Sequence, residues 1–198
     1  MQNPVPIESR ALGTLDYIRA SIESSGSMAV PGMAGIAMGA IGVGAALAAS
    51  SPGGSRFWLQ IWLIAAAMAL ALGWAMMARE AAQSGHARYL GPVRKFLLCL
   101  CPALFTGAIL TFALWRTGAT ALIPGAWLLL YGCAVLSAST VTIARTRRPI
   151  SLMGALFMLF GVVAFAAPPS AHNLILGLGF GVLHTVFGLL IRQVSHGD

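Results

Sequence analysis

The sequence predicts an all-α integral membrane protein with six transmembrane helices. Of its 198 residues, 58% are hydrophobic and only 9% are charged, whereas a soluble domain usually carries about 25% charged residues. Six apolar segments each approach or exceed the roughly 20 residues that a helix needs to cross the hydrocarbon of a bilayer. The Lys and Arg residues are concentrated in alternate connectors between these segments. The lipid bilayer is therefore the first partner that the sequence predicts.

The first predicted element, within residues 1–27, is a short amphipathic helix on the cytoplasmic face of the membrane. In TLDYIRASIESS, Leu15, Ile18 and Ile22 recur at helical spacing, and charged side chains occupy the other faces. A helix of this kind lies along the membrane surface with its apolar face in lipid. A disordered tail is the alternative. The following AVPG provides a bend before the chain enters the membrane.

The six predicted spans form one transmembrane domain over residues 28–192, followed by a cytoplasmic tail over residues 193–198. They pair as three antiparallel hairpins, whose short external turns contain SPGGSR, RTG and APPSAH. No Asp, Glu, Lys or Arg lies within a span, so each helix can cross lipid with its backbone hydrogen bonds satisfied internally. The predicted spans cover residues 28–50, 57–77, 96–115, 119–142, 150–167 and 173–191.

The basic residues predict the orientation of the chain. Of the 12 Lys and Arg residues, only Arg56 and Arg116 fall in the connectors on one side, and the other ten fall on the opposite side. Because cytoplasmic connectors are enriched in Lys and Arg, both termini are predicted to be cytoplasmic, in a bacterial inner membrane. Nucleic-acid binding is not predicted, because it would need a clustered basic face on a soluble fold.

The first and third predicted hairpins share a glycine pattern that suggests an internal repeat. In each hairpin, two glycines seven residues apart precede a proline at the turn, and another glycine lies late in the return helix. This spacing keeps small residues on one helix face and favours close helix packing in lipid. Aligned by the late glycines, His184 corresponds to Ala69. The glycines are Gly35, Gly42 and Gly73 in the first hairpin, and Gly154, Gly161 and Gly188 in the third.

Two short motifs resemble those of an uncharacterised family of bacterial six-span membrane proteins. They are AVPG, residues 29–32, at the start of the first span, and FGVLHTVFGLLIR, residues 180–192, at the end of the last. The three glycine-containing hairpins are also similar to the small acid-resistance membrane proteins of bacteria. These resemblances imply a six-span fold, and no established activity comes with either.

His184 is the only ionisable group well inside a predicted span. Such groups are costly in lipid and mark functional sites by default. A structural interpretation is a hydrogen bond from a neutral imidazole to a neighbouring helix. A functional interpretation is a binding site, in which Gly181, His184 and Gly188 share one helix face beside Tyr131. Candidate hydrogen-bond partners of His184 are Thr106, Thr111, Tyr131 and Ser137.

Two functional alternatives use His184 directly. It would be an axial ligand of haem or a chlorin, if the flanking glycines leave room for the macrocycle. His172 lies about 18 Å away along the same helix, so ligation by both histidines is not expected. The other alternative is a small channel or permease. Its solute would be neutral, because ion-coupled carriers usually place a carboxylate within a span and the six predicted spans contain none.

The remaining reactive residues predict neither an enzyme nor a metal site. Cys99, Cys101 and Cys133 are expected to be buried, small apolar residues, and no catalytic triad, paired carboxylates or phosphate-binding loop is recognisable. The sequence therefore favours a scaffold or accessory subunit that packs against a membrane-protein partner or a second copy of itself. The permease and the haem- or chlorin-binding subunit are the alternatives, and no other cofactor is predicted.

Overall fold

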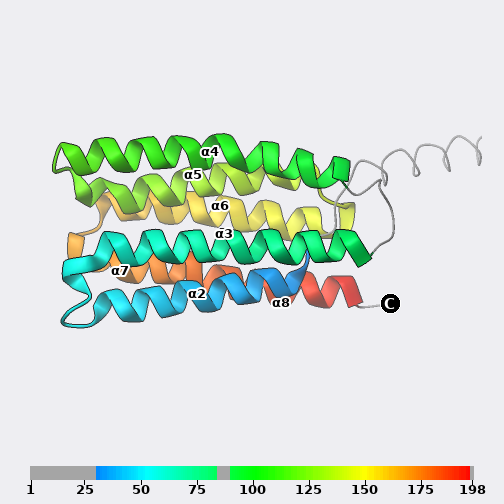
Figure 1. The fold of residues 1–198 in the computed structure, drawn as a ribbon, viewed down its shortest axis with the longest axis horizontal. Helices are drawn as coiled ribbons and strands as arrows, with labels where there is room; N and C mark the ends of the chain where they lie inside the picture. The colour runs from blue at the N-terminus through cyan, green and yellow to red at the C-terminus, as the bar shows by residue number, and fades with distance from the viewer. Residues whose placement is uncertain (1–29, 84–89, 197–198) are drawn as a thin grey trace, which may run out of the picture.

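The computed structural model of the chain describes residues 30–83 and 90–196. Over this part of the chain every regular element is helical, and six helical segments are long and apolar enough to cross a membrane. The helices run side by side along the long axis of the bundle (Figure 1). The chain is thus a multi-pass membrane protein built as a helix bundle. The predicted N-terminal amphipathic helix lies outside the described residues.

The first five spans are single helices, and the sixth is divided into three parts. Short 3₁₀ turns, η1 (Ser55–Phe57) and η3 (Thr120–Leu122), lead into the second and fourth spans. The sixth span consists of α7 (Pro169–Leu176), a π-helical segment η4 (Gly177–Leu183), and α8 (His184–His196). The other spans are α2 (Gly32–Ser50), α3 (Trp58–Gln83), α4 (Leu90–Arg116), α5 (Ile123–Ser139) and α6 (Ala144–Ala166).

Prolines account for several helix starts. Pro31 and Pro168 immediately precede α2 and α7, and Pro124 lies in the first turn of α5, where the missing N–H group has no partner in a helix anyway. The helix α6 begins at Ala144 rather than at the start of the predicted apolar span, residue 150. Helices therefore continue past the hydrocarbon into the polar connector, which an apolar window does not capture.

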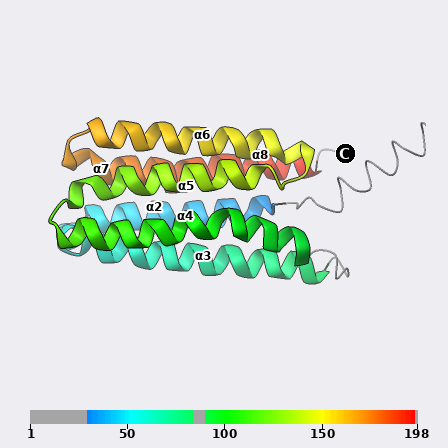
Figure 2. The ribbon, with the colours of Figure 1, turned by 90° about the horizontal axis from the view of Figure 1, so that it is seen from above.

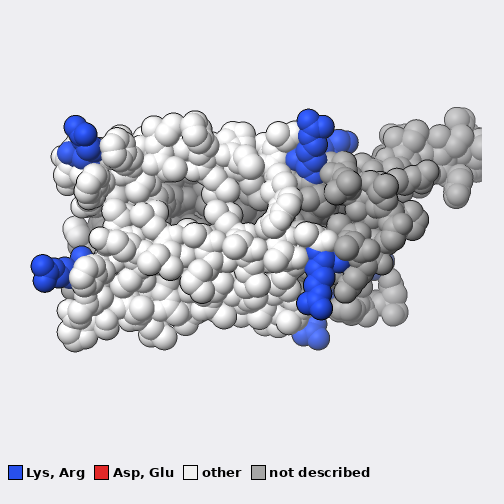
Figure 3. All heavy atoms as spheres, in the orientation of Figure 1, with Lys and Arg blue, Asp and Glu red and all other residues white. Residues whose placement is uncertain are grey.

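Charged residues lie at the two ends of the bundle and leave an uncharged belt between them (Figure 3). The start of α2 and the end of α8 lie at the same end, which we call the basic end (Figure 1). Large apolar side chains on the belt are exposed, for example Phe105 at 70% and Leu47 at 69%, as expected for a surface that faces lipid. The described Lys and Arg residues of the basic end are Arg79, Arg94, Lys95, Arg145, Arg147, Arg148 and Arg192.

Glycines bring two pairs of helices into very close contact. A Cβ atom on Gly42 of α2 would lie 2.5 Å from the carbonyl oxygen of Phe180 in η4. A Cβ atom on Gly154 of α6 would lie 2.8 Å from the backbone nitrogen of Leu136 in α5. The most extensive packing in the bundle joins α5 to α6 and α2 to the last span. The glycine pattern thus serves contacts between predicted hairpins, and the threefold repeat stays a prediction.

The helices α3 and α4 are separated from each other. Within the described residues, α3 makes extensive contact only with α2 and the adjoining turn η1, and α4 only with α5 and the adjoining turn η3. Seen from above, α3 lies at one edge of the bundle with α4 next to it, and α6 lies at the opposite edge (Figure 2). The surface between α3 and α4 is visibly hollowed (Figure 3).

Candidate functional site

Two adjoining cavities lie between α3 and α4. The first has a volume of about 230 Å³ and reaches Trp62 and Trp127 toward the end opposite the basic end. The second has a volume of about 160 Å³ and reaches Met77 and Phe96 near the basic end. The residues that line both cavities mark their junction, halfway along the bundle. These are Met38, Ala69, Leu70, Leu104, Tyr131 and His184.

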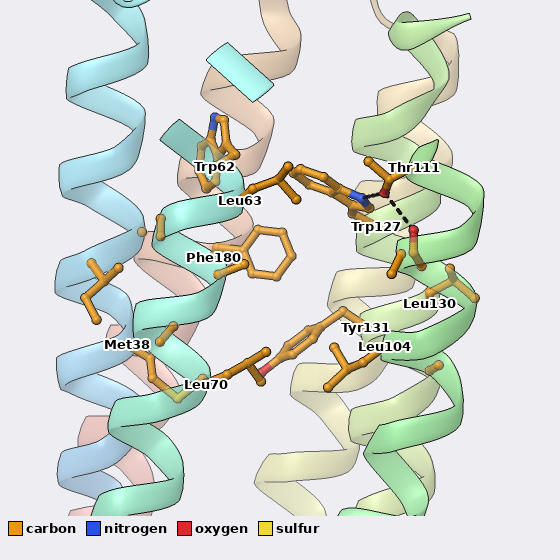
Figure 4. A pocket seen from close by; sticks show the side chains of 18 of the residues that line it. Met38, Trp62, Leu63, Leu70, Leu104, Thr111, Trp127, Leu130, Tyr131 and Phe180 are labelled. Carbon is orange, nitrogen blue, oxygen red and sulfur yellow. Dashed lines mark hydrogen bonds between the residues drawn. The ribbon is translucent and has the colours of Figure 1, made fainter. Parts of the chain in front are cut away.

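A hydrogen bond between the last span and α5 lies at this junction. The Tyr131 hydroxyl and His184 Nε2 are 2.7 Å apart. His184 is only 3% exposed, whereas Tyr131 is half-buried and extends from α5 toward Leu70 of α3 (Figure 4). Of the four candidate partners of His184, Tyr131 makes this bond, whereas Thr106 and Ser137 are exposed.

Aromatic packing fixes the orientation of the imidazole. The ring centroid of His184 lies 5.3 Å from those of Tyr131 and Phe157 and 6.2 Å from that of Phe180. Tyr131 in turn contacts Phe157 and Phe180 edge-on, with centroids 4.8 and 5.3 Å apart. These four rings, called here the aromatic cluster, close the inner wall of the junction and leave the Tyr131 hydroxyl beside the open space.

The π-helical segment η4 ends at Leu183, immediately before His184. Interruptions of this kind are often found at functional sites. Nδ1 of His184 is buried, and no atom in the described part of the chain meets hydrogen-bond geometry with it. The hydropathy of the last span predicts an uninterrupted helix, whereas the structure has a π-helical segment within it. The glycine-rich run GLGFG was the signal available for the interruption.

Two tryptophans of the first cavity are held by hydrogen bonds to the protein. Trp127 Nε1 donates to Thr111 Oγ1 at 2.7 Å, and Thr111 Oγ1 donates to the carbonyl oxygen of Gly107 at 2.6 Å (Figure 4). Trp62 Nε1 donates to Asn173 Oδ1 at 2.9 Å. These indoles therefore present apolar ring surface to the cavity.

A stacked pair of tryptophans bridges the end of the groove. Trp58, the first residue of α3, stacks on Trp127 of α5, with ring centroids 6.0 Å apart and an interplanar angle of 10°. This pair links α3 to the α4–α5 side of the bundle. It therefore helps to set the width of the groove between α3 and α4.

The two glycines predicted to share the site with His184 have a different role. A Cβ atom on Gly181 would lie 2.8 Å from Val43 Cγ2, and one on Gly188 would lie 2.6 Å from the backbone nitrogen of Ile36. Both glycines therefore pack tightly against α2. Gly188 also lines the second cavity. On the side facing α2, the space next to these glycines is filled by protein, and a cofactor at His184 stays a prediction.

The other candidate residues lie outside the site or at its edge. His172 is buried, with Nε2 3.1 Å from the carbonyl oxygen of Ala164 and 3.2 Å from that of Ala167 at the end of α6. The expectation that the cysteines are buried is wrong, because Cys101 and Cys133 are exposed and Cys99 is half-buried. Cys101 lines the second cavity, where a thiol is tolerated as a small apolar group.

No protein-family model, curated protein or solved structure matches this chain.

Proposed function

We propose that this chain is a non-enzymatic membrane protein that binds a small lipophilic molecule taken up from the bilayer between α3 and α4. The observation that carries this proposal is the pair of cavities on the hollowed face between the two helices (Figure 3). Sites for small molecules are concave and largely apolar, with a few fixed polar groups. Here Ala, Leu and Gly are the most frequent residues of the walls, and the Tyr131–His184 pair supplies polar groups at the junction.

The separation of α3 from α4 is unexpected, because both helices present small residues to the cavities between them. Toward the cavities, α3 presents Ala65, Ala69 and Gly73, and α4 presents Ala103 and Gly107. Small residues at such spacing let helices approach closely in lipid, yet α3 and α4 remain apart. An unfilled space forfeits dispersion contacts along its lining. A bound molecule would restore these contacts.

A second candidate is the scaffold or accessory subunit that the sequence favours. The same stripes of small residues on α3 and α4 support it, because they are typical surfaces for seating a helix of another membrane protein. This role would place a partner, or a second copy of the chain, against the groove. It differs from the ligand-binding role in needing a macromolecule.

The other two alternatives receive less support. A small channel or permease for a neutral solute would present mainly apolar walls to that solute in both cavities. Haem or a chlorin does not fit at His184, because Nε2 is engaged by Tyr131 and the ring is enclosed by the aromatic cluster. Within the described residues no cluster of three His, Cys, Asp or Glu side chains could hold a metal ion.

Quenching of tryptophan fluorescence by 1,10-dibromodecane tests the proposal on the full chain in nanodiscs. Bromine quenches at short range, and Trp62, Trp127 and Trp74 line the cavities. We expect a saturable component, above the linear quenching by probe dissolved in the lipid. The variant Ala69→Phe fills the junction and should abolish that component.

The matched control is Ala67→Phe. Ala67 is an exposed residue of the same helix that lines neither cavity, so saturation should persist in this variant. Purely linear quenching of the wild-type protein would refute ligand binding. Saturation that appears only when a co-purified protein has been removed would favour the scaffold role instead.

A further inference from the structure

We infer that the bound molecule is an uncharged lipophile with a hydroxyl group, such as an alcohol or a phenol, and that this hydroxyl donates a hydrogen bond to the Tyr131 oxygen. This inference rests on the proposed function and deepens it by assigning the chemistry of the ligand. It rests on which hydrogen-bond donors and acceptors of the lining side chains already have a partner within the protein.

The N–H and O–H donors of Trp62, Trp127 and Thr111 in the first cavity already donate hydrogen bonds within the protein. The indole N–H groups of Trp62 and Trp127 donate to Asn173 and Thr111, and the Thr111 hydroxyl donates to the backbone of Gly107. A ligand that needed a donor from these groups would have to break an existing bond. Thr111 Oγ1 already accepts from Trp127, and Thr111 is only 7% exposed, so the more accessible polar atoms are those of the Tyr131–His184 pair at the junction.

The chemistry of the two groups determines which of them donates in the hydrogen bond between Tyr131 and His184. A neutral histidine has one N–H donor and one bare acceptor nitrogen. A phenol O–H is a stronger donor than an imidazole N–H, and a bare imidazole nitrogen is a stronger acceptor than a phenol oxygen, so the 2.7 Å contact favours donation from Tyr131 to Nε2. This assigns the proton to Nδ1, the nitrogen without a well-formed partner. Nε2 is then the acceptor, and Tyr131 donates to it.

The Tyr131 oxygen keeps free acceptor capacity once its proton is committed to His184. A phenolic oxygen can donate one hydrogen bond and also accept. Because Tyr131 is half-buried and lines both cavities, a molecule at the junction can reach this oxygen. The packing of the Tyr131 ring within the aromatic cluster keeps the acceptor at that point.

The cavities also exclude a charged head group. Among the described residues that line them there is no Lys, Arg, Asp or Glu, and an unpaired charge inside a membrane is strongly disfavoured. A fatty acid anion or a phosphate ester would lack a counter-ion at this depth. An uncharged hydroxyl needs only one good acceptor, and its apolar part fills the first cavity beside Trp62 and Trp127.

The test compares 9,10-dibromodecan-1-ol with its methyl ether, which has the same chain but cannot donate. In nanodiscs, saturable tryptophan quenching should show the alcohol binding about fivefold more tightly than the ether, the ratio given by a net hydrogen bond of about 1 kcal/mol. In Tyr131→Phe this ratio should fall to about one, while the ether still binds. Comparing the two ratios cancels the different partitioning of the probes into lipid.

Thr106→Val is the control, because it removes an exposed hydroxyl of α4 that lines neither cavity, and it should keep the fivefold ratio. Equal saturable binding of alcohol and ether by the wild-type protein would overturn the hydroxyl assignment and leave the proposed function standing. Absence of saturable binding for both probes would overturn the proposed function itself.

Nitrogen NMR of the unliganded protein checks the assignment independently. In ¹⁵N-histidine-labelled protein, the His184 signals should show a protonated Nδ1 and a bare Nε2. The signals are assigned with the variant His184→Gln. A protonated Nε2 would reverse the hydrogen bond, free the Tyr131 proton for donation, and overturn the inference in favour of a carbonyl-containing ligand.

Discussion

Replacing Gly42 by alanine should destabilise the bundle, and the same change at Gly44 should not. Both glycines lie in α2, two residues apart. A Cβ atom on Gly42 would lie 2.5 Å from the carbonyl carbon and oxygen of Phe180, whereas one on Gly44 would have nothing within 4 Å. Since Phe180 contributes backbone atoms here, no side-chain rotation relieves the overlap, and α2 must move away from η4.

The expected cost of Gly42→Ala follows from the size of this movement. Ordinary van der Waals contacts of a Cβ atom begin near 3.4 Å, so the two helices must separate by about an ångström along a tightly packed interface. Overpacking of this kind costs about 1–3 kcal/mol. Gly44→Ala adds a methyl group that faces lipid, so its effect should stay within about 0.5 kcal/mol.

Reversible unfolding in mixed micelles measures both variants. The free energy of unfolding should fall by the amount given above for Gly42→Ala and remain near the wild-type value for Gly44→Ala. Equal effects of the two substitutions would refute the close contact between α2 and η4. A stabilising effect of Gly42→Ala would refute it as well.

Three further predictions concern hydrogen bonds and topology. Tyr131→Phe should lower the free energy of unfolding by about 0.6–1.7 kcal/mol, the range for interhelical hydrogen bonds in membranes; an unchanged value in the same micelle assay would argue against the bond to His184. Asn173→Ala should cost more, because its amide links Trp62 of α3 to the carbonyl oxygen of Ala46 in α2 and also donates to a serine there; a smaller loss than for Tyr131→Phe would contradict this link. Reporter fusions should place the C-terminus in the cytoplasm and an insertion at Gly53 outside, and the reverse result would invalidate the orientation drawn from the Lys and Arg residues.

The sequence predicts the helices well because hydropathy acts locally. Each span is apolar over about the thickness of a bilayer, and this fact needs no knowledge of its neighbours. The sequence also singles out His184, because a histidine inside an apolar span needs a hydrogen-bond partner. The choice of Tyr131 among four candidates required the actual packing of α5 against the last span.

The cavities were not predictable in the same way. Ala65, Ala69 and Gly73 on α3 form the kind of stripe that usually packs against another helix, and nothing local indicates that α4 stays away from it. Whether two helices meet depends on the contacts of all the others, including the stacking of Trp58 on Trp127. His184 and Ala69, which are equivalent positions in the predicted repeat, both line the two cavities. The repeat itself does not predict that they are neighbours.

The most direct test of the account is native mass spectrometry of the full chain released from mild detergent. We expect the wild-type protein and Ala67→Phe to carry a bound lipophilic molecule at near-stoichiometric occupancy, with an exchangeable hydroxyl proton, and Ala69→Phe to be free of it. A wild-type protein without any bound molecule, or equal occupancy in Ala69→Phe, would contradict the claim that the groove between α3 and α4 is a ligand site.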